Sequence, residues 1–98
     1  MDKKIINIEE LNILLAKSES GLSIELKNIW TEIKIEPELW FENVTSRSYW
    51  AIAIIDREVV WYNDTENGFN ISKFNELGTI GEYWSDQCPL EDLLWHLF

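Results

Sequence analysis

The side chains with the greatest chemical reactivity are one cysteine, Cys88, and one histidine, His96. A nucleophilic thiol needs a base beside it, and histidine is a common choice. These two residues are eight positions apart, which places them about 80° apart around an α-helix. We therefore expect no Cys–His pair. His96 is better explained as a cation at a helix end, and Cys88 as a small apolar filler.

A metal site is not expected from the sequence either. The chain has no CxxC motif and no pair of histidines, the usual ligands of zinc. Asn63, Thr65 and Asn67 stand at the offsets of calcium ligands, and Gly68 follows them as in a calcium-binding loop. The twelfth position of such a loop must be a bidentate glutamate, but it is Phe74 in this chain.

Paired carboxylates are the remaining route to catalysis, because two acids can serve as acid and base in glycoside hydrolysis. With 18 acidic side chains in 98 residues, such pairs arise by chance. The chain also has no glycine-rich phosphate loop. We therefore predict no catalytic residues, no cofactor and no metal, and a hydrolase is the weakest of three interpretations.

The net charge restricts the choice of partner. The formal value is −10, from 18 acidic and 8 basic side chains. Nucleic acids and anionic membranes are negative themselves, so neither is an expected partner. A basic protein is the natural complement, although charge that only maintains solubility is an equal alternative. Residues 51–98 hold nine acids and only two bases, together with many aromatic residues, which is typical of a recognition surface.

Length and composition predict a single domain over residues 1–98. The 46% hydrophobic content is sufficient for a folded core. One cysteine allows no internal disulfide, and no segment has the pattern of a signal peptide or a membrane span. We expect a cytoplasmic monomer.

The apolar run YWAIAIIDREVVWY at 49–62 is the predicted centre of the fold. It reads as two strands joined by a tight turn, apolar on both sides and therefore covered on both faces. A helix is predicted at 8–18, with Asn7 as its cap and Glu10 completing a capping box, and another at 89–98. The predicted fold class is α+β, a small antiparallel sheet centred on this hairpin and packed with an N-terminal and a C-terminal helix.

The other segments are less regular. Residues 22–35 alternate like a strand at both ends, whereas the middle has helical spacing, and we interpret both ends as strands. Pro37 should end this segment. The remaining predictions are a turn or helix start at 37–40, loops at 41–48 and 63–70, a brief helix at 71–77 and irregular structure at 79–87.

The segment VWYNDTENGFN at 60–70 is the most distinctive in the chain. The same pattern includes Trp30, Ile33, Ile35, Pro37, Trp40, Gly78 and Ile80. Over residues 29–94 the chain resembles a family of small acidic immunity proteins of bacterial toxin systems, including contact-dependent growth inhibition. It departs from the family pattern at Tyr49-Trp50-Ala51. The resemblance implies a small α+β fold that binds a cognate toxin domain without catalysis.

The resemblance agrees with the charge, because many toxins are nucleases with basic clefts that an acidic, aromatic-bearing surface can fill. Loops carry function more often than strands do. The expected partner-binding residues are therefore Asp64, Glu66, Glu82, Trp84 and Asp86. Each acid could instead be a solvated charge, and Trp84 a core aromatic. The residues expected to fix the loop are Tyr62, Asn63, Gly68 and Phe69.

A second interpretation is an adaptor or an oligomerising interaction domain. It predicts a self-complementary apolar patch around Trp95 and Phe98.

Overall fold

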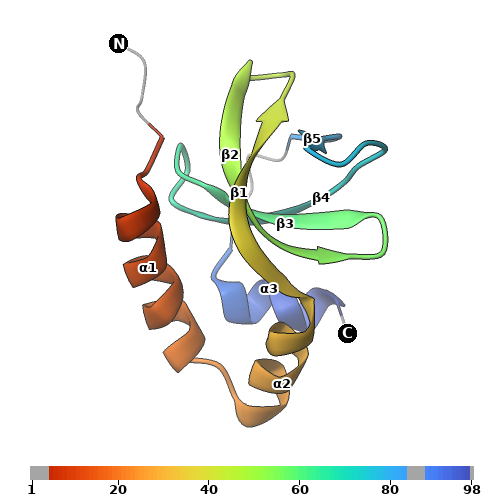
Figure 1. Ribbon diagram of the computed structural model, residues 1–98. Helices are drawn as coiled ribbons and strands as arrows, with labels where there is room; N and C mark the ends of the chain where they lie inside the picture. The colour runs from red at the N-terminus through yellow and green to blue at the C-terminus, as the bar shows by residue number, and fades with distance from the viewer. Residues whose placement is uncertain (1–4, 84–87, 98) are drawn as a thin grey trace.

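The computed structural model describes residues 5–83 and 88–97. The predicted α+β class is confirmed (Figure 1). The elements in chain order are α1 (Ile8–Ser20), α2 (Ile24–Ile33), β1 (Lys34–Glu42), β2 (Arg47–Ile55), β3 (Glu58–Asn63), β4 (Gly68–Lys73), β5 (Thr79–Ile80) and α3 (Leu90–Leu97).

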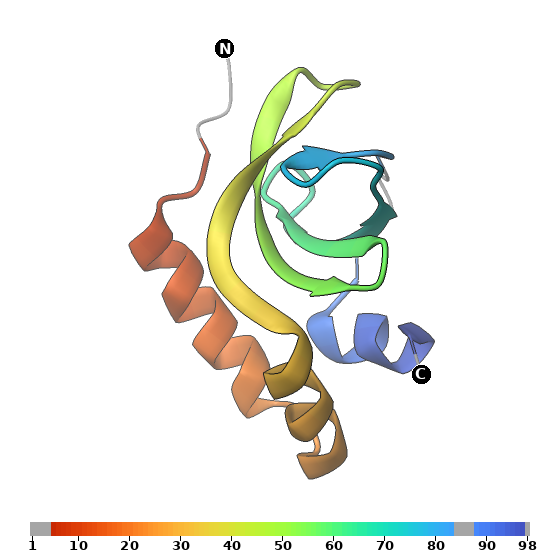
Figure 2. The same cartoon turned by 45° about the vertical axis from the view of Figure 1, so that its right-hand side comes forward.

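The five strands form one curled sheet in the order β4-β3-β2-β1-β5. Strands β1 to β4 pair in antiparallel fashion, and the short β5 lies parallel to β1 beside Phe41 and Glu42. The curl is seen from two sides in Figures 1 and 2. The Gly81 amide donates to the Lys73 carbonyl at 3.0 Å. This bond draws the chain after β5 against the end of β4, so the sheet approaches a closed barrel.

Curling divides the apolar residues between two cores. Trp61 belongs to the core inside the curl, whereas its neighbour Tyr62 belongs to the core between the sheet and the helices. This alternation follows from the two-residue period of a strand. The central hairpin is therefore covered on both faces, as predicted. The inner core consists of Trp40, Tyr49, Ala51, Val59, Trp61, Phe74 and Ile80.

The central hairpin is confirmed as β2 and β3, joined by a turn at Asp56-Arg57. Asp56 has a φ of 53°. Aspartate tolerates this left-handed conformation better than most residues. The turn can therefore form without the Asn-Gly or Asp-Gly pair that usually marks a two-residue hairpin.

The predicted N-terminal and C-terminal helices are confirmed. At the start of α1, Asn7 Oδ1 accepts the Glu10 amide at 2.8 Å, and Asn7 Nδ2 donates to Glu10 Oε1 at 2.7 Å. The buried side of α3 consists of Leu90, Leu93 and Leu94. In the described parts of the chain, no helix has the length and apolar character needed to cross a membrane.

The prediction for residues 22–40 is wrong in two respects. The first part is helix α2, which begins where Ser23 Oγ accepts the Leu26 amide at 3.3 Å. Its buried face, Leu26 and Trp30, shows that helical spacing outweighs the apparent alternation at the start of the segment. The second part is strand from Lys34 onward, which agrees with the strand predicted at the end of 22–35, but β1 runs through Pro37, where the segment was expected to end. The register with β2 shifts between Lys34 and Glu38, and proline is tolerated in sheets at such irregularities.

The predicted helix at 71–77 is also wrong, and the predicted loops at 41–48 and 63–70 are shorter than expected. Strand β4 ends within this segment and occupies residues 71–73, and residues 74–77 form no helix. Its inward side carries Asn70 and Ser72, both buried. A polar residue at an inward position hides the alternation on which strand prediction depends. The segment expected to be irregular at 79–87 begins with β5.

Candidate functional site

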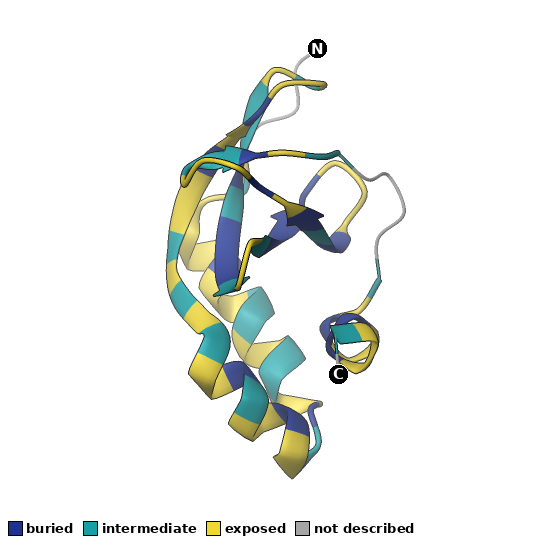
Figure 3. Ribbon diagram, turned by 90° about the vertical axis from the view of Figure 1, so that its right-hand side faces the viewer, coloured by how far each residue is buried: buried dark blue, intermediate teal, exposed yellow. Residues whose placement is uncertain are grey.

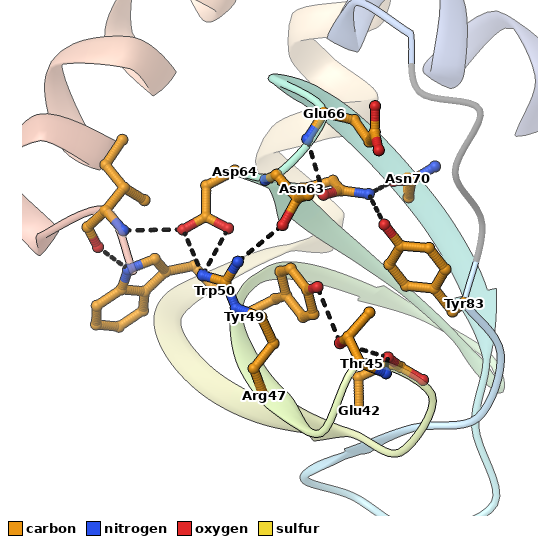
Figure 4. A network of polar contacts seen from close by, with 12 residues as sticks. Glu42, Thr45, Arg47, Tyr49, Trp50, Asn63, Asp64, Glu66, Asn70 and Tyr83 are labelled. Atoms are coloured by element: carbon orange, nitrogen blue, oxygen red, sulfur yellow. Dashed lines mark hydrogen bonds and ion pairs between the residues drawn. The ribbon is translucent and has the colours of Figure 1, made fainter. Parts of the chain in front are cut away.

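Two neighbouring turns form the candidate site, residues 43–46 between β1 and β2 and residues 64–67 between β3 and β4; we call them the turn pair (Figure 4). Arg47 joins them. Its Nη1 donates to Thr65 Oγ1 at 2.7 Å, and its Nη2 lies 3.0 Å from Asp64 Oδ1. Arg47 therefore links the two turns through these contacts.

Asp64 points into the protein and is only 5% exposed. Its Oδ2 accepts hydrogen bonds from the Ile6 amide at 2.9 Å and from Arg47 Nη2 at 3.2 Å. Its Oδ1, although 3.0 Å from Nη2, lies outside hydrogen-bonding geometry and interacts through charge alone. The Ile6 carbonyl in turn accepts the Trp50 Nε1 proton at 2.6 Å. Asp64 thus anchors the chain before α1 to the turn pair, and it offers a partner little surface.

Asn63 fixes the backbone of the second turn from inside. It is fully buried, and its Oδ1 accepts the amides of Thr65 and Glu66 at 3.1 and 3.2 Å. Its Nδ2 donates to Asn70 Oδ1 at 3.0 Å and to the Tyr83 hydroxyl at 3.4 Å. The side chain of Glu66 is exposed. An exposed carboxylate is therefore held on a turn whose backbone is already ordered.

The four residues expected to fix this loop are all buried, and Asn63 is the one that binds the loop backbone through the bonds described above. The rings of Tyr62 and Phe69 are 5.3 Å apart. Asn67 has a φ of 60°, a conformation that asparagine tolerates. Burial raises the pKa of the Tyr62 phenol above its usual 10.0, and the Asp64 carboxylate raises it further.

Glu42 organises the first turn and was not expected to be a structural residue. It is 1% exposed. Its Oε2 accepts the Val44 amide at 2.6 Å, and its Oε1 accepts the amide and the hydroxyl of Thr45 at 2.8 and 2.7 Å. The Tyr49 hydroxyl donates to the same Thr45 oxygen at 3.0 Å, and Tyr49 also lies under the Arg47 guanidinium. An acid in a predicted polar loop resembles a solvated charge, so the sequence gives no clear signal for this role.

Glu82 lies away from the turn pair, against the end of β4. Its Oε1 accepts the Lys73 amide at 3.2 Å, and its carbonyl accepts the Ser72 hydroxyl at 2.6 Å. The structure therefore brings Asp64 and Glu66 together but places Glu82 at a different position. The predicted residues Trp84 and Asp86 lie outside the described residues.

Glu82 also lines an open groove of about 550 Å³ between β4 and α3. Phe69 and Ile71 from β4, with Leu93 and Leu97 from α3, give the groove apolar walls. The other lining residues are Glu58, Asn70, Lys73, Glu82, Cys88 and His96.

Cys88 and His96 therefore border the same groove. Burial raises the pKa of the Cys88 thiol above 9.0, and the Asp92 carboxylate raises it further. A thiol with a raised pKa is a poor nucleophile at neutral pH. Within the described residues, no group of three or more His, Cys, Asp or Glu side chains is placed to hold a metal ion.

Comparisons with protein-family models, with curated proteins and with solved structures found no match for this chain.

Proposed function

We propose that this chain is an immunity protein, a non-catalytic cytoplasmic inhibitor that binds one toxin domain and neutralises it. The observation that carries the proposal is Glu66, an exposed carboxylate on a turn that Asn63 and the Arg47–Asp64 pair hold in place. A loop that is ordered beforehand loses little conformational freedom on binding. The fitting partner has a basic surface, such as the substrate cleft of a nuclease.

The distribution of charge supports a role in fast association. Exposed acids occur on all three helices, on β1 and on turns of the sheet. Such a field attracts a basic partner from a distance and raises the association rate. The exposed acids in the described residues are Glu9, Glu10, Glu25, Glu32, Glu36, Glu38, Asp56, Glu66, Glu76, Glu91 and Asp92.

Within this proposal, Glu66 contacts the toxin and Asp64 has a positioning role. Asp64 is buried against Arg47, so its charge is already paired inside the protein. Glu66 has no such constraint on its exposed side chain. In this proposal, Glu66 therefore makes the contact with the partner, and Asp64 maintains the geometry of the turn.

The test uses the protein encoded immediately upstream as the probe. A cell that inherits a toxin without its inhibitor is killed, so the two genes must be inherited together. Association and dissociation rates of the C-terminal domain of that protein are measured against the wild-type chain, Glu66→Lys and Glu32→Lys at low and high salt. Glu32 is an exposed acid on α2, so its variant has the same change in net charge.

We expect nanomolar binding that weakens with salt, because charge steers the association. Glu66→Lys should raise Kd by about tenfold or more, which is about 1.4 kcal/mol of binding free energy. Glu32→Lys should raise Kd by less. Equal effects of the two variants would contradict the role of Glu66, and absence of binding by the wild-type chain would contradict the proposed function.

One observation favours the interaction-domain alternative. Trp95 on α3 is 56% exposed, as expected for a residue of a self-complementary patch. The other predicted member of that patch, Phe98, lies outside the described residues. Sedimentation at high protein concentration tests the oligomerising version of this alternative, which requires a dimer that Trp95→Ser dissociates.

A further inference from the structure

The outer side of β1 carries apolar residues that the fold leaves uncovered. Leu39 and Phe41 are 47% and 44% exposed, whereas the alternating Trp40 and Glu42 are at most 1% exposed. The Phe41 amide donates to the Gly78 carbonyl at 2.9 Å. This bond brings the backbone of Leu77, the residue before Gly78, close to Phe41. Leu77 is 75% exposed. We call Leu39, Phe41 and Leu77 the β1 apolar face; exposed positions along β1 are seen in Figure 3.

Other parts of the outer side of the sheet are covered by helices. The helices pack on β2 and β4. Trp50, which pairs with Leu39 across the ladder, is half-buried and bonded to the Ile6 carbonyl. The chain before α1 thus covers Trp50 on β2 but leaves its neighbour Leu39 on β1 exposed. Adjacent exposed apolar side chains with an ordered, polar border are typical of a protein interaction surface.

Among residues 5–83 and 88–97, no strand pairs with the β1 edge before Phe41, which adds two backbone groups beside this face. The Phe41 amide points toward the β5 side, and alternate residues of a strand direct their amides to the same edge. Leu39 therefore points its amide and carbonyl to that edge, before the paired positions of β5 begin. Pro37 has no amide proton, so a long added strand is disfavoured there. Side chains must provide most of the contact with a partner.

The charges beside the face determine which partner fits. Glu76 directly precedes Leu77 and is exposed. Glu38 lies on the opposite side of β1, where it accepts the Trp40 indole proton at 2.8 Å. Arg47 pairs across the ladder with the inward Glu42 and is bound to Asp64, so its charge is not directed to this face. A second copy of the chain would bring two net charges of −10 together, which disfavours a homodimer through this face. A basic partner with an apolar patch would satisfy both the apolar face and the negative charge.

We infer that the β1 apolar face is the apolar anchor of the interface with the basic protein partner, an inference that rests on the proposed function. Aromatic and aliphatic anchors provide most of the binding free energy of an interface, whereas charges mainly set the rate of encounter. Phe41 and Leu77 should therefore control how slowly the complex dissociates. Glu66 should control how quickly it forms.

The test measures both rate constants for the full chain and the C-terminal domain of the upstream-encoded protein. The variants are Phe41→Ser and Leu77→Ser, with Ile13→Ser as the matched control. Ile13 on α1 is 72% exposed, close to the 75% of Leu77. Thermal unfolding of each variant verifies the fold, and Leu77→Ser provides the test if Phe41→Ser does not fold. We expect each variant of the face to raise the dissociation rate by about tenfold, with the salt dependence of association unchanged and the control unaffected.

Each outcome has a distinct meaning. If the wild-type chain binds and both variants of the face dissociate at the wild-type rate, the inference is wrong while the proposed function stands. If the wild-type chain does not bind, the proposed function fails and the inference fails with it. If sedimentation shows a wild-type dimer that Leu77→Ser dissociates, the face binds a second copy, and the assigned basic partner is wrong.

Discussion

At the scale of single residues, Asp64 and Glu66 show how one turn separates two roles for the same charge. They are two positions apart, yet Asp64 is buried and Glu66 is exposed. The difference comes from Arg47, 17 positions upstream of Asp64, and from the Ile6 amide, 58 positions from it. The sequence predicted that this loop matters and which of its residues fix it. It could not rank the two acids, because their partners are distant in sequence.

Replacement of Asp64 should destabilise the fold. Asp64→Ala leaves the Arg47 guanidinium, whose side chain is 19% exposed, without its counter-charge and the Ile6 amide without its acceptor. Breaking such a pair costs about 3 kcal/mol of unfolding free energy, measured by urea titration. Glu66→Ala is the control and should change this free energy by less than about 0.5 kcal/mol. Similar losses for the two variants would show that the Arg47–Asp64 pair contributes little.

Cys88 should make stability sensitive to alkaline pH. Its thiol pKa is raised above 9.0 by burial and by Asp92, so the unfolded chain ionises at a lower pH than the folded protein. The contribution of the thiol is complete below pH 9.0 and is lost as pH rises through the folded pKa.

Urea titrations between neutral pH and pH 10.0 measure this loss, and comparison with Cys88→Ala cancels the contribution of Tyr62, whose unfolded form begins to ionise at the upper end of this range. The unfolding free energy of Cys88→Ala should fall less steeply with pH than that of the wild-type protein. Parallel curves for the two proteins would contradict the raised pKa of the thiol.

At the scale of elements, the sequence predicted those with unambiguous local signals. The Asn7 cap located α1, and the apolar run at 49–62 located β2 and β3. It missed α2, because the first apolar residues of that segment alternate by chance. It missed β4 because Asn70 and Ser72 face inward, where they accept hydrogen bonds from Asn63 and the Trp61 indole. Hydrogen bonds to residues distant in sequence thus stabilise the inward side of β4, where prediction from the sequence expects apolar residues.

Closure of the curled sheet depends on one glycine. A Cβ at Gly81 would clash with the Lys73 carbonyl oxygen, the group that accepts the Gly81 amide. Gly81→Ala should therefore lower the unfolding free energy by about 1–3 kcal/mol. Gly21→Ala is the control, because its Cβ would lie 3.6 Å from the Ser18 oxygen in a helical conformation and should be tolerated. Equal stability of the two variants would show that the contact at Gly81 is not needed for closure.

At the scale of the whole molecule, a curled sheet with a core on each side presents the two features to which we assign binding. The turn pair holds an exposed carboxylate in place, and the β1 apolar face adds uncovered apolar area beside the exposed Glu76. In the proposed function, the net charge of −10 attracts a basic partner to both. Stability and recognition would then use different acids, with Glu42 and Asp64 inside and Glu66 outside.

The central claim is neutralisation of a toxin, and growth of a bacterial host tests it most directly. The C-terminal domain of the upstream-encoded protein is expressed alone, with the wild-type chain, and with a chain that carries both Glu66→Lys and Leu77→Ser. We predict arrested growth with the domain alone, full growth with the wild-type chain and arrest with the double variant at equal expression. A toxic domain that the wild-type chain does not neutralise, or a domain that is harmless alone, would contradict the account.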